Sequence, residues 1–284
     1  MTHSNRHADP AVSVRAVGCV TVVTMTDPAR RNVLARRMVQ ELVAAFDEAE
    51  ADGVTRCVVL AGEGTAFCAG AELSALEASA SGDFSGVEDV YRGFLRVLSS
   101  TLATIAVVNG PAVGAGLNLA LACDLRLATH QASFDSRFAK LRLIPGGGHS
   151  WLLERAVGRE TAVAMTVFGE RLDAAAAAAA GLVWRLYDTA EGATSAAVEL
   201  GGRLQGQDPQ FVAALTHLAR TAPARSSHAE ALDVERYMQR WSTSRPGFLD
   251  GVRRMRDAVE ARPQPSTEQH ARSEPAKPST RRSE

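Results

Sequence analysis

The chain has 284 residues, of which 46% are hydrophobic and 22% are charged, and its formal net charge is −1. This length accommodates one large domain, or one domain with a small appendage. A nearly neutral chain favours neither a nucleic acid nor an anionic membrane surface as its partner, and the sequence carries no nucleic-acid recognition motif.

The cysteines and the N-terminal stretch indicate a cellular compartment. Cys19, Cys57, Cys68 and Cys123 are widely spaced among apolar or small residues, a pattern typical of reduced, buried thiols in a cytoplasmic protein. No histidine or cysteine cluster has the spacing of zinc ligands, so we expect no metal site. The polar residues 1–11 lack the apolar segment of a signal peptide, and we expect them to form a flexible N-terminus.

The first part of the chain alternates between predicted strands and helices. Valine-rich residues 12–25 predict one or two strands, and the continuous apolar run 55–61 predicts a strand that is buried on both faces. Apolar side chains at helical spacing predict helices over 35–51 and 90–102. Between these elements lie a polar loop, DPARRNVL at 27–34, a glycine-rich loop at 62–73, and a polar stretch at 79–87 that we expect to be mobile.

An uncharged run at 101–123 raises the question of a membrane helix. Gly110 and Gly114 are four residues apart in it, as in helices that dimerise within membranes. The turn signal Asn109-Gly110-Pro111 divides the run into two parts. We therefore expect a short buried strand over 105–108, then a glycine loop and a buried helix, and no membrane span.

The rest of the chain continues as short strands and then becomes mostly helical. Strands that alternate with helices are typical of an α/β protein whose parallel sheet is covered by helices. After Arg262 the residues are Pro, Ser and charged types without a large apolar side chain, which predicts a disordered tail over 264–284. The expected elements are strands over 125–128, 132–138 and 182–187, a loop at 145–148, and helices from residue 151 onward, among them 208–222, 228–243 and 246–261.

The two glycine-rich loops do not match nucleotide-binding motifs. Gly62-Glu-Gly64 and Gly114-Ala-Gly116 lack the third glycine of a dinucleotide site and the Gly-Lys-Ser/Thr of a P-loop. A serine hydrolase is also disfavoured, because the sequence has no G-x-S-x-G elbow. Loops that lead into helix N-termini nevertheless expose backbone N–H groups, and two such loops that face each other can bind one developing oxyanion.

Six blocks follow one another in a recognisable order. Three are AFCAGAEL at 66–73, VVNGPAVGAGLNLALACDLRLA at 107–128 and FDSRFAKLRLIPGGGHSWLLERAVG at 134–158; the others are DPARRNVL at 27–34, GERLDAAAAAAAGLVWRL at 169–186 and RPGFLDGVRRMRDAVEARP at 245–263. Together they resemble the crotonase family, which is the enoyl-CoA hydratase/isomerase superfamily, over about residues 12–263.

This resemblance implies a fold, a partner and an assembly. The fold is α/β, with a crotonase-like spiral core of ββα units over 12–205 and a C-terminal helical trimerisation region over 206–263. The assembly is a homotrimer or a dimer of trimers. The substrate is an acyl-CoA thioester, and no separate cofactor is implied because coenzyme A is part of the substrate.

The resemblance also assigns the two glycine-rich loops a role. It places the backbone N–H groups of Ala71 and Ala115 in an oxyanion hole that stabilises a thioester enolate. The residues agree with this role, because small side chains leave the amides accessible and Ala115 lies where a helix is predicted to begin.

The CoA itself is implied to lie along DPARRNVL and the loop before Ala71. Arg30 or Arg31 would contact its phosphates, or each is a solvated loop charge. Glu72 stands where the family usually has aspartate, and His149 is either near the cavity or a loop residue. The residues implied to contact CoA or substrate are Arg30, Arg31, Ala69, Glu72, Leu73, Gly114, Phe138, Gly146 and His149.

Three positions depart from the family's pattern. Typical hydratases hold two catalytic glutamates where this chain has Asn118 and Phe138, and an isomerase-like branch has an aspartate where this chain has Gly146. None of the three can transfer a proton at neutral pH, and general acid–base catalysis contributes about 10²–10⁴-fold. Asn118 either orients a water or a substrate carbonyl, or is a satisfied polar group near the helix start.

Several functions remain open at this point. The leading hypothesis is a member of the enoyl-CoA hydratase/isomerase class that acts in fatty acid or acyl-CoA metabolism. The alternatives are a non-catalytic acyl-CoA binding protein, a related reaction that needs only enolate stabilisation, and a structural protein. The nearest acidic residues in the sequence are Asp135, Glu77 and Glu154, and we expect surface or structural roles for them.

Overall fold

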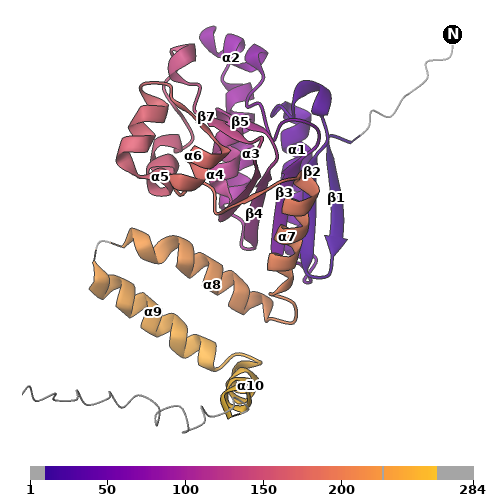
Figure 1. The fold of residues 1–284 in the computed structure, drawn as a ribbon, viewed down its shortest axis with the longest axis vertical. Coiled ribbons are helices and arrows are strands. Elements are labelled where there is room, and N and C mark those ends of the chain that lie inside the picture. Colours follow the sequence, from indigo (N-terminus) through magenta and orange to yellow (C-terminus); the bar gives the residue numbers. More distant parts are fainter. Residues whose placement is uncertain (1–9, 226, 261–284) are drawn as a thin grey trace, which may run out of the picture.

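The main sheet has six strands in the spatial order β1-β2-β3-β4-β6-β9 (Figure 1). β1 and β2 are antiparallel, and the other neighbouring strands are parallel, as expected where helices connect the strands. The computed structural model describes residues 10–225 and 227–260, so residues 1–9 and the predicted tail lie outside the described residues. The strands are β1 Val12–Val17, β2 Val20–Met25, β3 Cys57–Gly62, β4 Ala103–Val108, β6 Leu125–Thr129 and β9 Arg185–Tyr187.

Helices cover both faces of this sheet. In β3, Val58 and Leu60 belong to one apolar cluster, which also contains residues of α1, α3 and α4. Val59 belongs to a second cluster with Ala193 and Ala197 of α7. β3 is thus buried on both faces, which confirms the prediction from its continuous apolar run. The helices of this part are α1 Arg36–Ala51, α2 Leu73–Ala80, α3 Ser85–Leu98, α4 Ala115–Ala122, α5 His149–Thr166, α6 Ala174–Ala179 and α7 Ala190–Gly202.

A second, three-stranded sheet was not predicted. It consists of β5 Pro111–Val113, β7 Ser133–Asp135 and β8 Arg171–Asp173. β7 pairs with β5 in parallel and with β8 in antiparallel orientation. The sequence predicted a loop at β5 and helix at β8, and both predictions were wrong because a three-residue strand is too short to show a period-two pattern.

The stretch 79–87, which was expected to be a mobile polar segment, contains the end of α2 and the start of α3. The Asp83 carboxylate accepts a hydrogen bond from the Ser85 N–H at 3.0 Å, and Gly82 adopts a φ of +93° in the turn between the helices. Short polar residues here form the connection of a helix pair.

Three further helices follow the core, α8 Pro209–Thr221, α9 His228–Thr243 and α10 Phe248–Glu260, close to the three predicted ranges. They lie on one side of the α/β core, below it in Figure 1. Across residues 10–225 and 227–260, no helix combines the length and the apolar character that a bilayer crossing requires.

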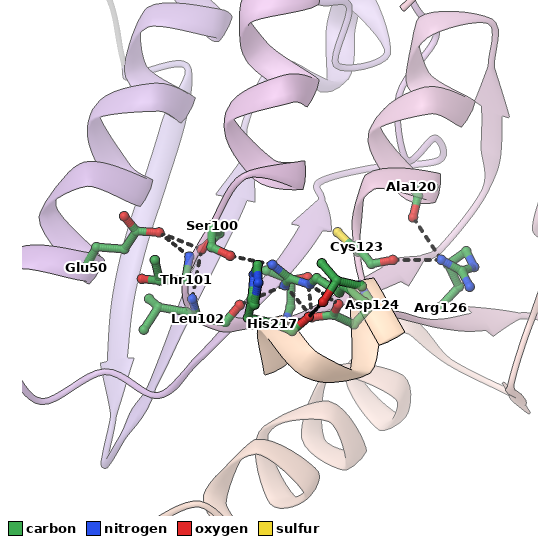
Figure 2. Close-up of polar contacts among 12 residues, drawn as sticks. Glu50, Ser100, Thr101, Leu102, Ala120, Cys123, Asp124, Arg126 and His217 are labelled. Carbon is green, nitrogen blue, oxygen red and sulfur yellow. Dashed lines mark hydrogen bonds and ion pairs between the residues drawn. The ribbon is translucent and has the colours of Figure 1, made fainter. Parts of the chain in front are cut away.

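Arg220 connects α8 to the core. Its guanidinium donates to the Asp124 carboxylate at 2.6 and 2.7 Å, to the Leu102 carbonyl at 3.0 Å, and to the Ser100 carbonyl. Figure 2 shows Asp124, Ser100 and Leu102 beside α8. Asp124 also accepts from the N–H and hydroxyl of Thr104 at 2.8 and 2.9 Å, so the contact joins α8 to the start of two strands.

Replacing Arg220 tests how much its contacts with the core stabilise the position of α8. In Arg220→Met, the partly buried Asp124 carboxylate loses its counter-charge, and we expect the free energy of unfolding to fall by about 2 kcal/mol. Urea denaturation measures the change. The control is Arg240→Met, because Arg240 is exposed on α9 and a surface change of this kind is expected to have an effect within about 0.5 kcal/mol. Equal effects of the two variants would contradict the role of Arg220.

Candidate functional site

A cavity of about 910 Å³ opens between α2, α3, the N-terminal end of α4 and residues 136–146. Its apolar wall comes largely from α2 and α3, including Leu76, Val87 and Phe94. Most of the predicted site residues lie on its wall, whereas Arg31 and His149 do not. Those that line it are Arg30, Ala69, Ala71, Glu72, Leu73, Gly114, Ala115, Asn118, Phe138 and Gly146.

Two backbone segments meet at one end of this cavity. The Cys68 N–H donates to the Pro111 carbonyl at 3.2 Å, and the Val113 N–H donates to the Cys68 carbonyl at 3.0 Å. A Cβ at Gly70 would lie 2.6 Å from the Val113 oxygen, and a Cβ at Gly116 would lie 2.2 Å from the Cys68 oxygen. Only glycine permits so close an approach of the two segments.

This approach brings the amides of Ala71 and Ala115 to the same wall. Ala115 is the first residue of α4 and follows Gly114, whose φ of 54° and ψ of −116° favour glycine. An N–H in the first turn of a helix has no partner within the helix. Within the described ranges, no hydrogen bond uses the N–H of Ala71 or Ala115. The cavity therefore contains two available donors and a helix N-terminus.

The mouth of the cavity is built by the loop at 27–34. The side chain of Asn32 is fully buried and donates to the carbonyls of Glu63 and Ala66, each at 2.9 Å. The Leu34 N–H donates to the Gly70 carbonyl at 2.8 Å, so this loop runs along the segment that carries Ala71. Asn32 was not predicted from the sequence, since a lone asparagine in a polar loop gives no sign that its side chain will be buried and bonded to two backbone carbonyls.

Charged side chains at the mouth are paired with each other. The Arg30 guanidinium, 51% exposed, forms an ion pair with Glu72, while the Arg31 backbone has a positive φ and its side chain is exposed. Asp135, 2% exposed, contacts Arg137 at 2.8 Å and Lys140 at 3.6 Å. Asp135 is therefore held by cations, in agreement with its expected structural role.

A buried polar network begins at Asn118 in the cavity wall and extends behind it to His149. The Asn118 amide donates to the Gly146 carbonyl at 3.2 Å, and its oxygen lies 2.6 Å from Nδ1 of His149. Nε2 of His149 lies 2.9 Å from the Ser136 hydroxyl. The Phe138 ring packs edge-on against the His149 ring, with centroids 4.9 Å apart. Each polar atom of the Asn118 side chain thus has a partner.

These contacts fix the protonation state of His149. Burial lowers the pKa of the His149 imidazole from 6.5 to about 4, so the ring is neutral near pH 7. The Asn118 oxygen can only accept, so Nδ1 carries the proton and Nε2 accepts from the Ser136 hydroxyl.

The order serine, histidine, asparagine is that of a nucleophilic triad. However, Ser136 is 0% exposed, and His149 and Asn118 are each 1% exposed. Ser136 and Asn118 are among the lining residues of the cavity, but so little of their surface is accessible that we expect the network to support the wall and not to supply a nucleophile. Ser136 was missed in the sequence because nothing in the block around it marks its contact with a residue thirteen positions later.

The described residues contain no group of three His, Cys, Asp or Glu side chains that could hold a metal ion. The polar features of the cavity include the two amides, the mouth ion pair and the hydroxyl of Tyr91; the other polar side chains that line it are those of Ser74, Ser79, Glu88, Asn118, Ser136 and Arg137.

Comparison with known proteins identifies the family of the chain. The family model described as enoyl-CoA hydratase/isomerase matches residues 15–258. The chain belongs to the enoyl-CoA hydratase/isomerase family. Members of this family bind acyl-CoA thioesters, and they typically need no cofactor.

Two relatives and one solved structure illustrate the likeness. The chain is 49% identical over 177 residues to the probable enoyl-CoA hydratase EchA14 of Mycobacterium tuberculosis, a match that covers 60% of this chain and just under two thirds, 66%, of that protein. It is 33% identical over 238 residues to 1,2-epoxyphenylacetyl-CoA isomerase of Escherichia coli, covering 82% and 90%. A crystal structure of an enoyl-CoA hydratase from Bacillus anthracis superposes on the chain with a TM-score of 0.80 at 25% identity. The match covers 87% of the chain described and 96% of the Bacillus anthracis chain. The crotonase-like α/β fold with a helical C-terminal part is thereby confirmed.

Adding a single methyl group tests the close approach of the two segments. In Gly116→Ala the new Cβ would meet the Cys68 carbonyl, so we expect the segments to move apart. The expected loss is about 1–3 kcal/mol in the free energy of unfolding, measured by urea denaturation. The control is Gly202→Ala at the end of α7, where a Cβ meets nothing within 4 Å. If Gly116→Ala is as stable as this control, the contact does not constrain the site.

The buried His149 predicts a dependence of stability on pH. Between pH 6.5 and about 4 the unfolded imidazole binds a proton while the folded one stays neutral. The unfolded state thus binds more protons, so stability falls as the pH is lowered through this window and levels off below it. We expect wild type to lose up to about 1.4 kcal/mol per pH unit relative to His149→Gln. Urea unfolding of both proteins across this range measures the difference, and parallel curves would contradict the buried neutral state.

Proposed function

We propose that the protein binds acyl-CoA thioesters and stabilises their enolates with the backbone N–H groups of Ala71 and Ala115. The observation that carries this proposal is the pair of available amides on one wall of a large, mostly apolar cavity. Membership of a family that binds acyl-CoA thioesters supports the choice of ligand. The activity places the protein in the enoyl-CoA hydratase/isomerase class, within fatty acid or acyl-CoA metabolism.

The chemistry follows from where charge develops. When a proton leaves the carbon next to a thioester carbonyl, negative charge moves to the carbonyl oxygen. Two N–H donors that already point at this oxygen bind the charged form more strongly than the neutral form. The positive end of the α4 dipole adds to this preference. In other enzymes, loss of one such donor costs about 2.7–4 kcal/mol of transition-state stabilisation.

The mouth of the cavity suits the coenzyme part of the ligand. In the proposal, CoA lies along the loop at 27–34, with its pantetheine near the backbone of Ala69, Glu72 and Leu73. Arg30 contacts a phosphate, for which its ion pair with Glu72 must open; exposed pairs of this kind are weak. Arg31 is the second arginine of the same loop. Gly114, Phe138, Gly146 and Asn118 surround the acyl group, and His149 supports that wall from behind.

A second candidate function is non-catalytic binding of acyl-CoA. The observation that favours it is that Asn118 and Phe138, at the positions where the resemblance implies hydratase glutamates, are not carboxylates. Asn118 is bonded to His149 and Gly146, and Phe138 packs against the His149 ring. Neither provides a base for activating water. A reaction that needs only enolate stabilisation, with proton transfer by solvent or substrate, lies between the two candidates.

For the assembly we propose a homotrimer or a dimer of trimers in the cytoplasm. Apolar side chains are exposed on the C-terminal helices, including Leu215, Tyr237, Leu249 and Met255. Helices with such exposed faces are typical of an interface between subunits.

Binding and exchange measurements test the proposed function together. Calorimetric titration compares octanoyl-CoA with the octyl thioether of CoA, which lacks the carbonyl oxygen. We expect the thioester to bind about tenfold tighter, because only it accepts from the two amides. NMR in D₂O then follows exchange of the protons next to the carbonyl, and the absorbance of crotonyl-CoA follows hydration.

The outcomes separate the candidates. Tight thioester binding with proton exchange supports enolate stabilisation. Tight binding without exchange or loss of absorbance supports the non-catalytic alternative. Equal affinity for thioester and thioether would contradict a role for the two amides, and no binding of either would remove acyl-CoA as the ligand.

A further inference from the structure

The loop at Gly146 and Gly147 leaves space that two aromatic residues of α3 occupy. A Cβ built on Gly146 would lie 1.7 Å from the Tyr91 hydroxyl oxygen, and a Cβ on Gly147 would lie 2.1 Å from the Phe94 ring. The two rings are three residues apart on one face of α3, with centroids 5.6 Å apart. The Tyr91 hydroxyl therefore stands where any side chain at position 146 would begin.

The hydroxyl of Tyr91 has no protein partner among the described residues, since no hydrogen bond involves it in residues 10–225 and 227–260. Tyr91 is half-buried and lines the cavity among the apolar side chains of α3, such as Val87 and Phe94, together with Glu88, three residues earlier on the same helix. A phenol in such surroundings is usually paired when the site is filled. Its missing partner is therefore expected on the ligand.

The position of this hydroxyl relates it to the two amides. The Gly146 carbonyl accepts from the Asn118 side chain at 3.2 Å, and Asn118 lies three residues after Ala115, one turn along α4. A ligand whose carbonyl meets Ala71 and Ala115 thus carries its first acyl carbons past the wall formed by Asn118, Gly146 and Tyr91. In the proposed binding mode, the phenol lies beside the acyl chain.

We propose that Tyr91 selects acyl-CoA thioesters that carry an oxygen substituent on the acyl chain close to the thioester, such as a hydroxyl or a carbonyl group, by donating its phenolic hydrogen to that oxygen. This inference rests on the proposed function. A plain alkyl chain that fills the cavity excludes water from the phenol and leaves it unpaired, whereas an oxygen substituent restores the hydrogen bond. A site built to hydrogen-bond one substrate oxygen discriminates against the analogue that lacks it.

Comparing the affinities of two esters whose acyl chains have equal length tests whether Tyr91 selects the oxygen-bearing ester. Calorimetry on the full chain measures the affinities of 3-hydroxybutyryl-CoA and butyryl-CoA. For wild type we expect the hydroxylated ester to bind about tenfold tighter, which is the size of one neutral hydrogen bond. In Tyr91→Phe we expect equal affinities for the two esters, with butyryl-CoA bound as in wild type. The control is Tyr187→Phe on β9, a half-buried tyrosine that is not among the residues lining the cavity, and it is expected to keep the preference.

Each other outcome has a definite meaning. If wild type binds the two esters equally, or if Tyr91→Phe keeps the preference, the role of Tyr91 is overturned while the proposed function stands. If neither ester binds wild type, the proposed function fails and this inference fails with it. Thermal denaturation of each variant shows whether it is folded.

Substitutions at Gly146 and Tyr91 test, independently of ligand binding, whether the Tyr91 hydroxyl occupies the space beside Gly146. Gly146→Asp alone is expected to lower the melting temperature, since its Cβ collides with the Tyr91 hydroxyl. Adding Tyr91→Ala to this variant frees the space and is expected to recover part of the loss. If Tyr91→Ala recovers none of the loss caused by Gly146→Asp, Tyr91 does not occupy that space, and the inference is overturned.

Discussion

The site depends on the contact between the backbone at Cys68 and the first turn of α4. At this point no side chain fits between the segments, because the Cys68 oxygen lies where a Cβ of residue 116 would be. Backbone hydrogen bonds on both sides of the contact hold it in register. Two amides from distant parts of the chain are thereby fixed on one wall before any ligand arrives, and donors fixed in advance need no reorganisation when charge develops. The cavity, the mouth loop and the helix pair α2–α3 are arranged around this contact.

The opposite condition holds around Asn118, where the polar side-chain atoms of the buried network are already paired. Hydrogen bonds join Asn118, His149 and Ser136, and burial keeps the imidazole neutral. A buried network that is fully satisfied is rigid and has no free donor or acceptor for a substrate. The two ends of the cavity thus differ in physical terms: backbone N–H groups are available at one end, and the phenol of Tyr91 and the carboxylate of Glu88 line the wall that α3 forms.

The sequence predicted the alternation of strands and helices and the two glycine-rich loops well, because both signals are local. A buried parallel strand such as β3 is a continuous apolar run, and a close approach of backbones requires glycine at fixed places. What could not be predicted depends on contacts between distant residues. Asn118 and His149 are 31 positions apart, and Asn32 and Ala66 are 34 apart. The Tyr91 hydroxyl lies where a side chain of residue 146 would begin. A buried histidine, an asparagine in a loop and a tyrosine on a helix have the same local patterns whether or not they form part of a site. The roles assigned to the site residues from the resemblance stay predictions until ligand binding is measured.

The thiol of Cys68 lies directly beneath the wall that carries Ala69 and Ala71, and it is fully buried. Unsaturated acyl thioesters are electrophiles, and the species that attacks them is the thiolate, not the thiol. Burial raises the pKa of the Cys68 thiol to about 12, so almost none of it is ionised near neutral pH. The same glycine contact that exposes the amides also covers this sulfur. If the cavity binds unsaturated acyl thioesters, as proposed, the burial of this thiol protects the site from alkylation by its ligand.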